Sequence, residues 1–592
     1  MDGPRPGGDS GNCLHTYGID ALNHPTIPIV LAPPNRQRKR QAPKGRRVDP
    51  QALAEVRTLL QGETLRRDRL IEYLHRINDR HGQLGSPHLA ALAQELRLAQ
   101  TEVYEVASFY HHFDIVKEGP DGRVAAAPAL TVRVCDGLSC EMAGAQDLLL
   151  RLPALLGTDV RVIPAPCVGR CEQAPVAVVH HNALPTATAE GVQALVQAQA
   201  TEPASEPYVD LASYVAQGGY AVLRDCLQGR RDVESVIKAL EDSGLRGLGG
   251  AGFPAGRKWR IVRNEPAPRL MAVNIDEGEP GTFKDRVYLE RDPHRFIEGL
   301  LIAAWAVGIE AIYVYLRDEY HGCRALLEAE LAKLRANPPA GALPTIELRR
   351  GAGAYICGEE SAMIESIEGK RGLPRLRPPY VAQVGLFGRP TLEHNFETLY
   401  WVRDLLEKGA TWFASQGRHG RKGLRSFSVS GRVKSPGVKL APAGITLREL
   451  IDEHCGGMAD GHTLYGYLPG GASGGILPAS LADVPLDFDT LQPHGCFIGS
   501  AAVVVLSNHD TAVNAARNTM RFFKHESCGQ CTPCRAGTAK SLALIEQPQW
   551  DLPLLAELSQ VMRDASICGL GQAAPNPVDC VIKYFPHELK GA

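Results

Sequence analysis

Two sets of four cysteines constrain this chain more than any other feature of its sequence. The first set comprises Cys135, Cys140, Cys167 and Cys171, and the second comprises Cys528, Cys531, Cys534 and Cys568. The total of 15 cysteines is odd, and the N-terminus lacks a basic and then apolar signal pattern. Both observations favour reduced thiols bound to metal over disulfides. The fold must therefore bring four thiols together at each of two places.

The first set has the spacing C-x4-C, a gap of 26 residues, and then C-x3-C. A [2Fe-2S] cluster needs four thiolates, and two loops that carry two cysteines each can clamp it from either side. Zinc pairs are usually two to four residues apart, so the C-x3-C half alone leaves a zinc site open. The x4 spacing beside Gly137 and Gly169 favours the [2Fe-2S] cluster.

The second set reads C-G-Q-C-T-P-C, with a distant fourth member, Cys568, in the stretch C-G-L-G. Three closely spaced thiolates can reach three corners of a cubane cluster, and a remote cysteine takes the fourth corner. Zinc sites rarely use three cysteines so close together. The second set therefore predicts a [4Fe-4S] cluster. The other cysteines show no ligand spacing and are interpreted as small buried hydrophobes.

Length and composition are typical of a large multidomain globular protein. The chain has 592 residues, of which 44% are hydrophobic, and this length suggests about three to five domains. A formal net charge of −2 gives no overall attraction to nucleic acid or anionic membrane. No apolar run approaches the roughly 18 residues of a membrane span. Arg46-Arg47 precedes no apolar stretch, which excludes twin-arginine export, so we expect a cytoplasmic protein.

The apolar pattern changes along the chain. Residues 1–48 are rich in Pro, Gly and Arg, and are interpreted as a solvated, disordered tail or as a basic arm that docks on an acidic partner. Helical periodicity follows from about 50 to 118, with Leu70, Leu74 and Ile77 on one face. This part of the sequence predicts a small helical bundle.

Two α/β regions follow the helical segment. Strands are predicted at Leu130–Val134, Val160–Ile163, Val176–Val179, Arg269–Val273, Ala311–Tyr315 and Thr345–Leu348. Helices alternate with them, as in open α/β sheets, and the first cysteine set lies at strand ends and loops. Short strands with Gly and Pro turns occupy about 425–508, and helices flank the last cysteines from about 511.

A glycine-rich loop carries the next chemical signal. Gly247-Leu-Gly249-Gly250-Ala-Gly252-Phe253 matches G-x-G-x-x-G, but a helix precedes it, and a standard dinucleotide fingerprint needs a strand there. The glycines still let the backbone approach a ligand closely. A simple flexible turn is the alternative.

Two acidic loops follow predicted strands, where open α/β sheets bind ligands. The first is N-I-D-E-G-E-P-G, which begins at Asn274, and its carboxylates can be metal ligands, ribose contacts or a solvated turn. The second, G-A-Y-I-C-G-E-E-S from Gly353, again combines a glycine turn with acids. Both loops are candidates for hydrogen bonds to a sugar or a ring.

Four segments together resemble a known family. LRGLGGAGFPAGRKW, NIDEGEPGTFKDR, GAGAYICGEES and ESCGQCTPCRAG are similar to the flavin-bearing, NADH-oxidising subunit of respiratory complex I. The first cysteine set, with VASFYHHFD before it, resembles the neighbouring subunit that carries a two-iron cluster. Such fusions occur in NAD-reducing hydrogenases and NAD-dependent formate dehydrogenases. PKGRRVDP, GRVKSPGVKLAPAGIT, YLPGGASGGILPAS and ICGLGQAAPNPV look most like the β subunits of molybdenum- or tungsten-containing formate dehydrogenases.

The resemblance implies a multidomain α/β fold. The expected parts are a tail (1–48), a helical bundle (49–120), a thioredoxin-like [2Fe-2S] ferredoxin module (121–200), a Rossmann-like FMN- and NAD-binding domain (201–424), a β-grasp (ubiquitin-like) domain (425–510) and a C-terminal helical bundle with the [4Fe-4S] cluster (511–592). It also implies FMN and NAD(H) as cofactors.

The family's cofactor contacts transfer to positions of this chain that match its motifs. FMN would be held by Gly247, Gly249, Gly250, Lys258, Asn274, Asp276, Gly358 and Asn395. NAD(H) would stack near Phe253, with Glu279 beside the nicotinamide as the catalytic residue. Glu360 would lie near the ribose or pyrophosphate, and Arg377 and Tyr380 at the adenine end. Further cofactor contacts are expected from Gly252, Glu277, Tyr355, Glu359, His394 and Thr398.

Three of these positions depart from the family's usual residues. His394 stands where the family usually has an asparagine, and this replacement affects an expected contact with the flavin phosphate. Arg377 and Tyr380 replace a lysine and a phenylalanine, which keeps charge and aromaticity but changes the hydrogen-bond geometry of the cation.

The implied function is that of the NAD+-reducing diaphorase subunit of a formate dehydrogenase. Formate would be oxidised on a large partner subunit that carries a molybdenum or tungsten pterin and further Fe–S clusters. Electrons would pass through clusters to FMN and by hydride to NAD+, with CO2 reduction in reverse. The alternatives are the diaphorase subunit of a bidirectional NAD-reducing hydrogenase, a fused complex I NADH-oxidising subunit, and a cluster-bearing scaffold that binds nucleotide without turnover.

Overall fold

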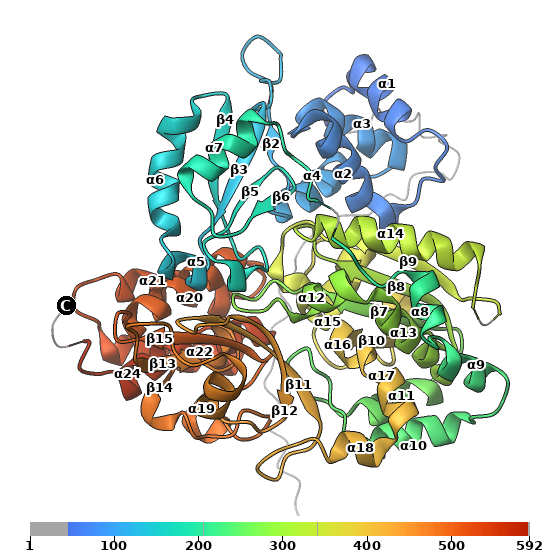
Figure 1. Ribbon diagram of the computed structural model, residues 1–592. Helices are drawn as coiled ribbons and strands as arrows, with labels where there is room; N and C mark the ends of the chain where they lie inside the picture. The colour runs from blue at the N-terminus through green and yellow to red at the C-terminus, as the bar shows by residue number, and fades with distance from the viewer. Residues whose placement is uncertain (1–44, 205, 340, 590–592) are drawn as a thin grey trace, which may run out of the picture. The chain divides into compact units, whose positions relative to one another are not determined.

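The computed structural model describes residues 45–204, 206–339 and 341–589 (Figure 1). The chain divides into two compact units, Met1–Arg46 and Arg47–Ala592, and all described helices and strands belong to the second. The predicted basic tail lies almost entirely outside the described residues. The domain boundaries expected from the sequence stay predictions.

Four helices open the described chain, namely α1 (Pro50–Leu59), α2 (Leu70–His81), α3 (Ser86–Leu96) and α4 (Gln100–Phe109). Asp49 caps α1 by accepting a hydrogen bond from the backbone N–H of Ala52. Gly82 ends α2 in the left-handed conformation, which glycine adopts without strain. Leu70 and Leu74, on the predicted apolar face of α2, are fully buried. The helical periodicity of the sequence therefore corresponds to real core faces.

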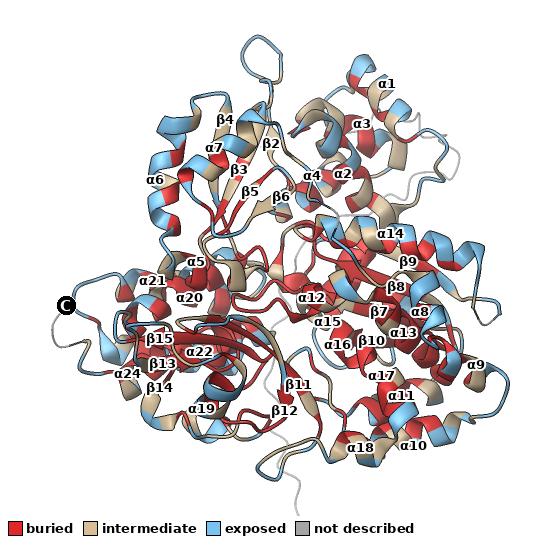
Figure 2. Cartoon of the chain, viewed as in Figure 1, coloured by how far each residue is buried: buried red, intermediate tan, exposed pale blue. Residues whose placement is uncertain are grey.

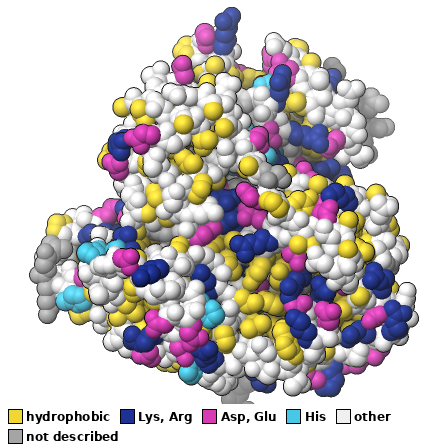
Figure 3. All heavy atoms as spheres, viewed as in Figure 1, with side chains coloured by type: hydrophobic (Ala, Val, Ile, Leu, Met, Phe, Trp, Pro, Cys, Tyr) yellow, Lys and Arg dark blue, Asp and Glu magenta, His cyan; other side chains and the backbone are white. Residues whose placement is uncertain are grey.

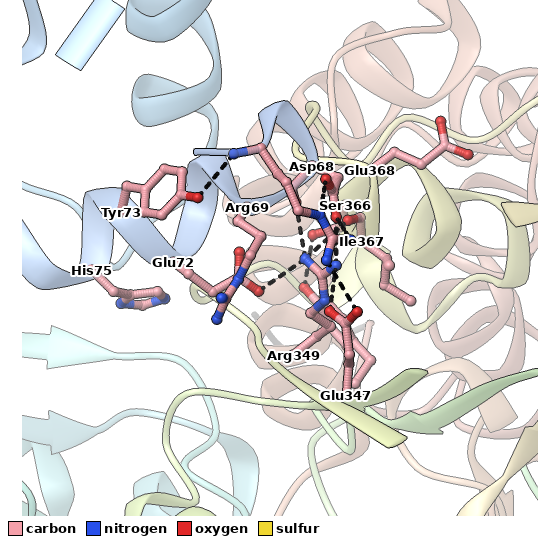
Figure 4. Close-up of polar contacts among 12 residues, drawn as sticks. Asp68, Arg69, Glu72, Tyr73, His75, Glu347, Arg349, Ser366, Ile367 and Glu368 are labelled. Carbon is pink, nitrogen blue, oxygen red and sulfur yellow. Dashed lines mark hydrogen bonds and ion pairs between the residues drawn. The ribbon is translucent and has the colours of Figure 1, made fainter. Parts of the chain in front are cut away.

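One buried arginine joins these helices to the central sheet. Arg349, near the end of β9 (Thr345–Arg350), pairs with Asp68 at 2.6 Å, Glu72 at 3.3 Å and Glu347 at 3.0 Å (Figure 4). Its side chain is only 2% exposed. Burial raises the pKa of the Glu72 carboxyl. The contact between helices and sheet thus includes a charge cluster in which Asp68 and Glu347 also pair with Arg66, whereas Glu72 pairs with Arg349.

Replacing Arg349 with methionine is expected to destabilise the protein by about 3–5 kcal/mol, because the desolvated Glu72 loses its ion-pair partner, while Asp68 and Glu347 keep Arg66. The urea midpoint of the purified protein measures this loss. Arg57→Met is the matched control, since Arg57 is 59% exposed and its pair with Glu95 should contribute less than about 1 kcal/mol. Equal midpoints for the two variants would show that the cluster does not stabilise the fold.

The next part contains a four-stranded sheet in the order β4-β3-β5-β6. Its strands are β3 (Leu130–Cys135), β4 (Val160–Ala165), β5 (Ala177–Val179) and β6 (Asn182–Leu184). β3 pairs in parallel with β4 and antiparallel with β5. Two longer helices, α6 (Ala145–Leu156) and α7 (Ala189–Gln197), pack against this sheet and each other. Cys135 ends β3, and Cys140 lies in the short helix α5 (Leu138–Met142).

The central sheet is entirely parallel, in the order β10-β7-β8-β9. Its other strands are β7 (Arg269–Ile275), β8 (Ile309–Leu316) and β10 (Thr391–Asn395). Figure 2 shows these strands and helix α13 (Pro293–Val307) as largely buried. Strands covered on both faces read as continuous apolar runs, which is why the sequence predicts β7 and β8. The order places the polar residues that end β7 and β10 side by side.

A five-stranded sheet follows, in the order β12-β11-β15-β13-β14, where the sequence predicts short strands. Its strands are β11 (Leu424–Gly431), β12 (Gly437–Pro442), β13 (Leu464–Leu468), β14 (Leu477–Pro478) and β15 (Ala502–Ser507). β11 and β15 are parallel, and the other neighbours are antiparallel. The loops of this sheet reach the cavity described below.

Helices complete the chain. They are α20 (Ala512–Glu526), α21 (Thr532–Ile545), α22 (Leu552–Ala565), α23 (Gly569–Ala573) and α24 (Asn576–Tyr584). Among the described residues, no helix is both long and apolar enough to cross a membrane. On the face drawn in Figure 3, basic and acidic side chains are interspersed, in keeping with the net charge of −2.

Candidate cofactor cavity and cysteine clusters

A cavity of about 840 Å³ lies where the glycine loop meets the carboxyl ends of β7 and β10. Its lining includes Gly247, Gly249, Gly250, Gly252, Phe253, Lys258, Asn274, Asp276, Glu277, Glu279, Tyr355, Gly358, Glu359, Glu360, Arg377, His394 and Asn395. The two predicted cofactor residues outside the lining are Tyr380, which is 57% exposed, and Thr398. Cys568 of the second cysteine set also lines the cavity.

The glycine loop joins two helices, α10 (Val233–Ser243) and α11 (Ala255–Asn264). It is closed by a hydrogen bond from the Gly247 N–H to the Phe253 carbonyl, at 2.8 Å. The Leu248 N–H donates to Thr398 Oγ1 at 2.9 Å, so Thr398 braces the loop from behind. A Cβ at Gly249 would stand 2.8 Å from the Cβ of Asn395, which no side chain tolerates. Glycine is therefore needed where the loop meets β10.

The end of β7 presents a carboxylate with an unused acceptor. Asn274 donates from Nδ2 to the Gly358 carbonyl at 2.8 Å and accepts at Oδ1 from the Asp276 N–H at 2.9 Å. This holds Asp276 with its Oδ2 buried and without a hydrogen-bond partner. Burial raises the pKa of Asp276 well above its usual value. An unsatisfied buried acceptor in a cavity fits a ligand that brings a hydrogen-bond donor, as the ring and ribityl groups of FMN do.

The two glutamates of the acidic loop have different tasks. Glu277 accepts from the backbone N–H groups of Asp285 at 2.8 Å and Arg286 at 3.1 Å, which begin α12 (Lys284–Arg291). Its Oε2 also accepts from the Tyr320 hydroxyl at 2.8 Å. Burial and the Asp285 charge raise the pKa of Glu277 to about 7. Glu277 is therefore a helix cap, although it also lines the cavity.

Glu279 is anchored by Ser473, and the Ser500 side chain is also within hydrogen-bonding reach of its carboxyl. Glu279 Oε1 accepts from the N–H of Ser473 at 2.8 Å and from the Ser473 hydroxyl. The side chain passes so close to Gly471 that a Cβ there would be 2.9 Å from the Glu279 Cδ. Burial raises the pKa of Glu279 to about 7. This carboxyl thus changes charge in the neutral range at a fixed position in the cavity.

The acids of the second loop form pairs at the other side of the cavity. Glu359 caps α15 (Glu360–Ile367) by accepting from the N–H groups of Ser361 at 3.0 Å and Ala362 at 2.9 Å. Arg377 pairs with Glu359 and, at 2.9 Å, with Glu360. A negatively charged ligand must therefore compete with both acids for Arg377.

His394 on β10 is held in one tautomer. Its Nε2 accepts from the indole N–H of Trp259 at 2.8 Å, so a neutral ring carries its proton on Nδ1. Burial, and then the charge of Lys258, lower the pKa of His394 well below its usual value. Lys258 itself donates to the Glu393 carbonyl at 3.0 Å. Where the family usually has an asparagine, this chain therefore presents a neutral N–H donor.

The thiols of the first cysteine set gather at one point. Cys167 Sγ lies 3.3 Å from Cys171 Sγ, and the Cys135 thiol is within hydrogen-bonding reach of Cys140 and Cys167. All four are buried. The Gly281 N–H, two residues beyond Glu279, donates to Cys171 Sγ at 3.3 Å. Backbone donors to sulfur are a feature of iron–sulfur sites, where they tune the potential.

Two arginines fasten this cysteine set to the central domain. Arg317 donates from Nη2 to the Cys167 carbonyl at 2.7 Å, and Arg286 donates from Nε to the Gly169 carbonyl at 2.9 Å. Both guanidinium groups are almost completely buried. The two-iron set is therefore part of the same packed structure as the acidic loop.

The second cysteine set combines two helix starts. Cys531 is the residue before α21, Cys534 lies in its first turn, and Cys568 is the residue before α23. Cys528 follows the end of α20 by two residues. Unpaired backbone N–H groups at a helix start favour negative charge, which a thiolate-bound cluster carries. Because Cys568 also lines the cavity, the second set lies directly beside it.

Sequence reasoning missed the contribution of the five-stranded sheet to the cavity. Ser473, Phe497 and Ser500 line it from loops of that sheet. Ser473 belongs to the stretch YLPGGASGG, whose glycine content signals close backbone approach. No pattern in that stretch pairs it with Glu279, which lies 194 residues earlier.

Comparison with known proteins matches four regions of the chain. Residues 56–200 match the thioredoxin-like [2Fe-2S] ferredoxin, 240–404 the Nuo51 FMN-binding domain, 426–477 the SLBB domain and 514–592 the NADH-ubiquinone oxidoreductase-F iron-sulfur binding region. Each cysteine set falls in a region of its own cluster type. The prediction of FMN, a [2Fe-2S] cluster and a [4Fe-4S] cluster is confirmed at this level.

Whole proteins are similar as well. The chain is 41% identical over 401 residues to the mitochondrial NADH dehydrogenase [ubiquinone] flavoprotein 1 of Dictyostelium discoideum, covering 64% of this chain and 83% of that protein. It is 40% identical over 375 residues to the mitochondrial NADH-ubiquinone oxidoreductase 51 kDa subunit of Neurospora crassa, covering 60% and 76%. A chain of an NAD+-reducing [NiFe]-hydrogenase superposes with TM-score 0.77 and 34% identity, covering 89% and 93%. The chain therefore belongs to the family of 51 kDa, NADH-oxidising flavoprotein subunits of NADH-quinone oxidoreductases, with a two-iron ferredoxin module in the same polypeptide.

Proposed function

We propose that this chain is the NAD(H)-converting subunit of an NAD-dependent formate dehydrogenase. One observation carries the redox part of this proposal: a single cavity is lined by the glycine loop, by Glu279 and by Cys568. FMN, when bound, exchanges a hydride with a nicotinamide and single electrons with iron–sulfur clusters. The cavity thus joins a nucleotide site to a cluster site.

Each side of the cavity has a task in this proposal. The backbone of the glycine loop and the Nδ1–H of His394 would bind phosphate or ribityl oxygens, and Asp276 would accept from a ring or hydroxyl donor. Glu279, at a fixed position and with a pKa of about 7, would set the charge beside the nicotinamide. Phe253, 38% exposed at the cavity, offers its ring for stacking.

The assignment to formate dehydrogenase rests on the sequence segments that resemble its β subunits, and on a complete first cysteine set, which the hydrogenase subunits of this superfamily often lack. The competing candidate is the diaphorase subunit of an NAD-reducing hydrogenase. The hydrogenase chain that superposes over 89% of this chain favours that candidate. Both candidates need a partner subunit that oxidises the primary substrate.

NADH oxidation by ferricyanide tests the shared part of the two candidates. FMN-replete protein is expected to turn over without its partner, because ferricyanide accepts electrons directly from reduced flavin. A cluster-bearing scaffold would bind NADH without oxidising it. Absence of turnover in protein with full FMN content would therefore reject both oxidoreductase candidates.

The large subunit that co-purifies with this chain separates the candidates. Formate-dependent NAD+ reduction by that complex, with molybdenum or tungsten in the partner, is the expected result. Hydrogen-dependent reduction, with nickel in the partner, would assign the chain to a hydrogenase instead.

A further inference from the structure

A second cavity, of about 270 Å³, lies behind the glycine loop and shares no lining residue with the first. Its lining includes Arg246 and Leu248 from the start of the loop, Arg421 and Arg425 from before and within β11, and Asp487 and Phe488. The domain matches and the cofactor proposal leave this cavity without a role.

The lining of the second cavity is basic. Arg246, Arg421, Lys422 and Arg425 face Asp487 within the lining. Asp487 is shared, since it accepts from Arg425 at 2.8 Å and from Arg421 at 2.7 Å.

Two further acids lie close to this lining. Asp489 pairs with Arg246 at 2.6 Å, and the buried Glu397 behind Arg425 is already paired with Lys284. Lys422 is exposed and forms no ion pair with any described residue. Four cations therefore face two carboxylates, Asp487 and Asp489, which leaves a surplus of two positive charges.

Arg425 adds a buried donor that the protein does not satisfy. Its side chain is 3% exposed, and its Nε is buried without a hydrogen-bond partner. Arg246 and Arg425 lie 4.4 and 4.2 Å from the centroid of the Phe488 ring. Burying an incompletely paired guanidinium costs free energy, which an anion with several acceptor oxygens would recover.

We propose that the second cavity binds a phosphate group, either as inorganic phosphate or as the phosphate of a small phosphorylated metabolite. A dianion matches the surplus of two positive charges, and guanidinium groups suit its oxygens. The volume lies just below the roughly 300 Å³ at which pockets for larger ligands begin, so a dinucleotide is too large. The Phe488 ring is already covered by guanidinium groups, which leaves it unavailable for stacking on a base.

The bound anion would act on the glycine loop. Arg246 donates from Nε to the Gly252 carbonyl at 2.5 Å, and the Phe488 ring contacts Gly252 so closely that a Cβ there would be 2.6 Å from it. An anion that draws Arg246 away from Asp489 therefore shifts the loop of the first cavity. By thermodynamic linkage, phosphate would then change the affinity for NAD(H), a consequence that rests on the function proposed above.

Phosphate binding is tested on the full FMN-replete protein by isothermal titration at constant ionic strength. The arms are inorganic phosphate, glycerol phosphate, and chloride as the blank. Saturable binding of either phosphate compound supports the proposal, and tighter binding of glycerol phosphate assigns the ligand to phosphorylated metabolites. Binding of neither compound overturns the proposal.

Variants locate the site. Lys422→Gln breaks no ion pair and is expected to weaken phosphate binding about tenfold, the loss of one charge-assisted contact. Lys434→Gln is the matched control, because Lys434 pairs with Asp460 on an exposed surface of the same sheet region. Equal phosphate affinity in the parent and the Lys422→Gln protein would overturn the assignment of the phosphate to this cavity. Binding is measured without turnover, so inactivity towards NADH would reject the proposed function and leave this result standing.

Discussion

Cys568→Ala is expected to remove the [4Fe-4S] cluster and to lower NAD+ reduction by electrons that enter through that cluster about 100-fold or more. Replacing even an outer partner of a metal ligand commonly costs 10–100-fold, and Cys568 is a predicted ligand itself. NADH oxidation by ferricyanide should persist, because this acceptor takes electrons from the flavin. The EPR spectrum of the reduced variant should lack the four-iron signal and keep the two-iron signal.

Cys226→Ala is the matched control for Cys568→Ala. Cys226 is also buried, at 1% exposure, but belongs to neither set. Its loss should cost about 1 kcal/mol of stability and leave both cluster signals unchanged. A Cys568→Ala protein with an intact four-iron signal would remove Cys568 from the ligand set.

Glu279→Gln is expected to slow hydride transfer by roughly 10- to 100-fold with both clusters intact. Its carboxyl, with a pKa raised to about 7 by burial, is neutral below that pH and anionic above it. In the proposed NAD(H) site, the Glu279 anion beside the nicotinamide would stabilise the positive ring of NAD+. The KM for NAD+ should therefore fall as the pH rises through 7 in the parent. This fall in KM should be absent in Glu279→Gln. Stopped-flow kinetics between pH 5.5 and 8.5, a range of about 1.5 units on either side of that pKa, measures both effects.

Glu277→Gln provides a sharp comparison, because the Glu277 pKa is also raised to about 7 in the same loop. Glu277 caps α12 and accepts from Tyr320, so its replacement should lower stability by about 1.5–3 kcal/mol. In Glu277→Gln, the KM for NAD+ should still fall as the pH rises through 7. If Glu279→Gln instead lost stability and kept the fall in KM through pH 7, Glu279 would be a structural residue.

Some of this architecture could be predicted from the sequence because its signals are local. Cysteine spacing identified both clusters, and apolar runs predicted β7 and β8, the two largely buried inner strands of their sheet. The strand β10 was not predicted, because Glu393 and His394 interrupt its apolar pattern. Their partners, Lys258 and Trp259, lie on α11, 135 residues earlier.

The parts of the site that sequence reasoning missed depend on contacts between distant segments. The N–H of Gly281 donates to Cys171, 110 residues earlier in the chain, and Ser473 holds Glu279 across 194 residues. Each contact uses a common residue type with no local signature. Only the folded chain shows that the acidic loop touches one cysteine set while its cavity is lined by Cys568 of the other.

We infer that one cavity joins the nicotinamide site to the [4Fe-4S] cluster beside Cys568. Low-temperature EPR of anaerobic, FMN-replete protein after NADH addition shows whether electrons from the nicotinamide site reach this cluster. We expect iron and sulfide for one [2Fe-2S] and one [4Fe-4S] cluster, and a four-iron signal that NADH generates in the parent but not in Cys568→Ala. Zinc in place of iron, or a four-iron cluster that dithionite reduces and NADH does not, would contradict this inference.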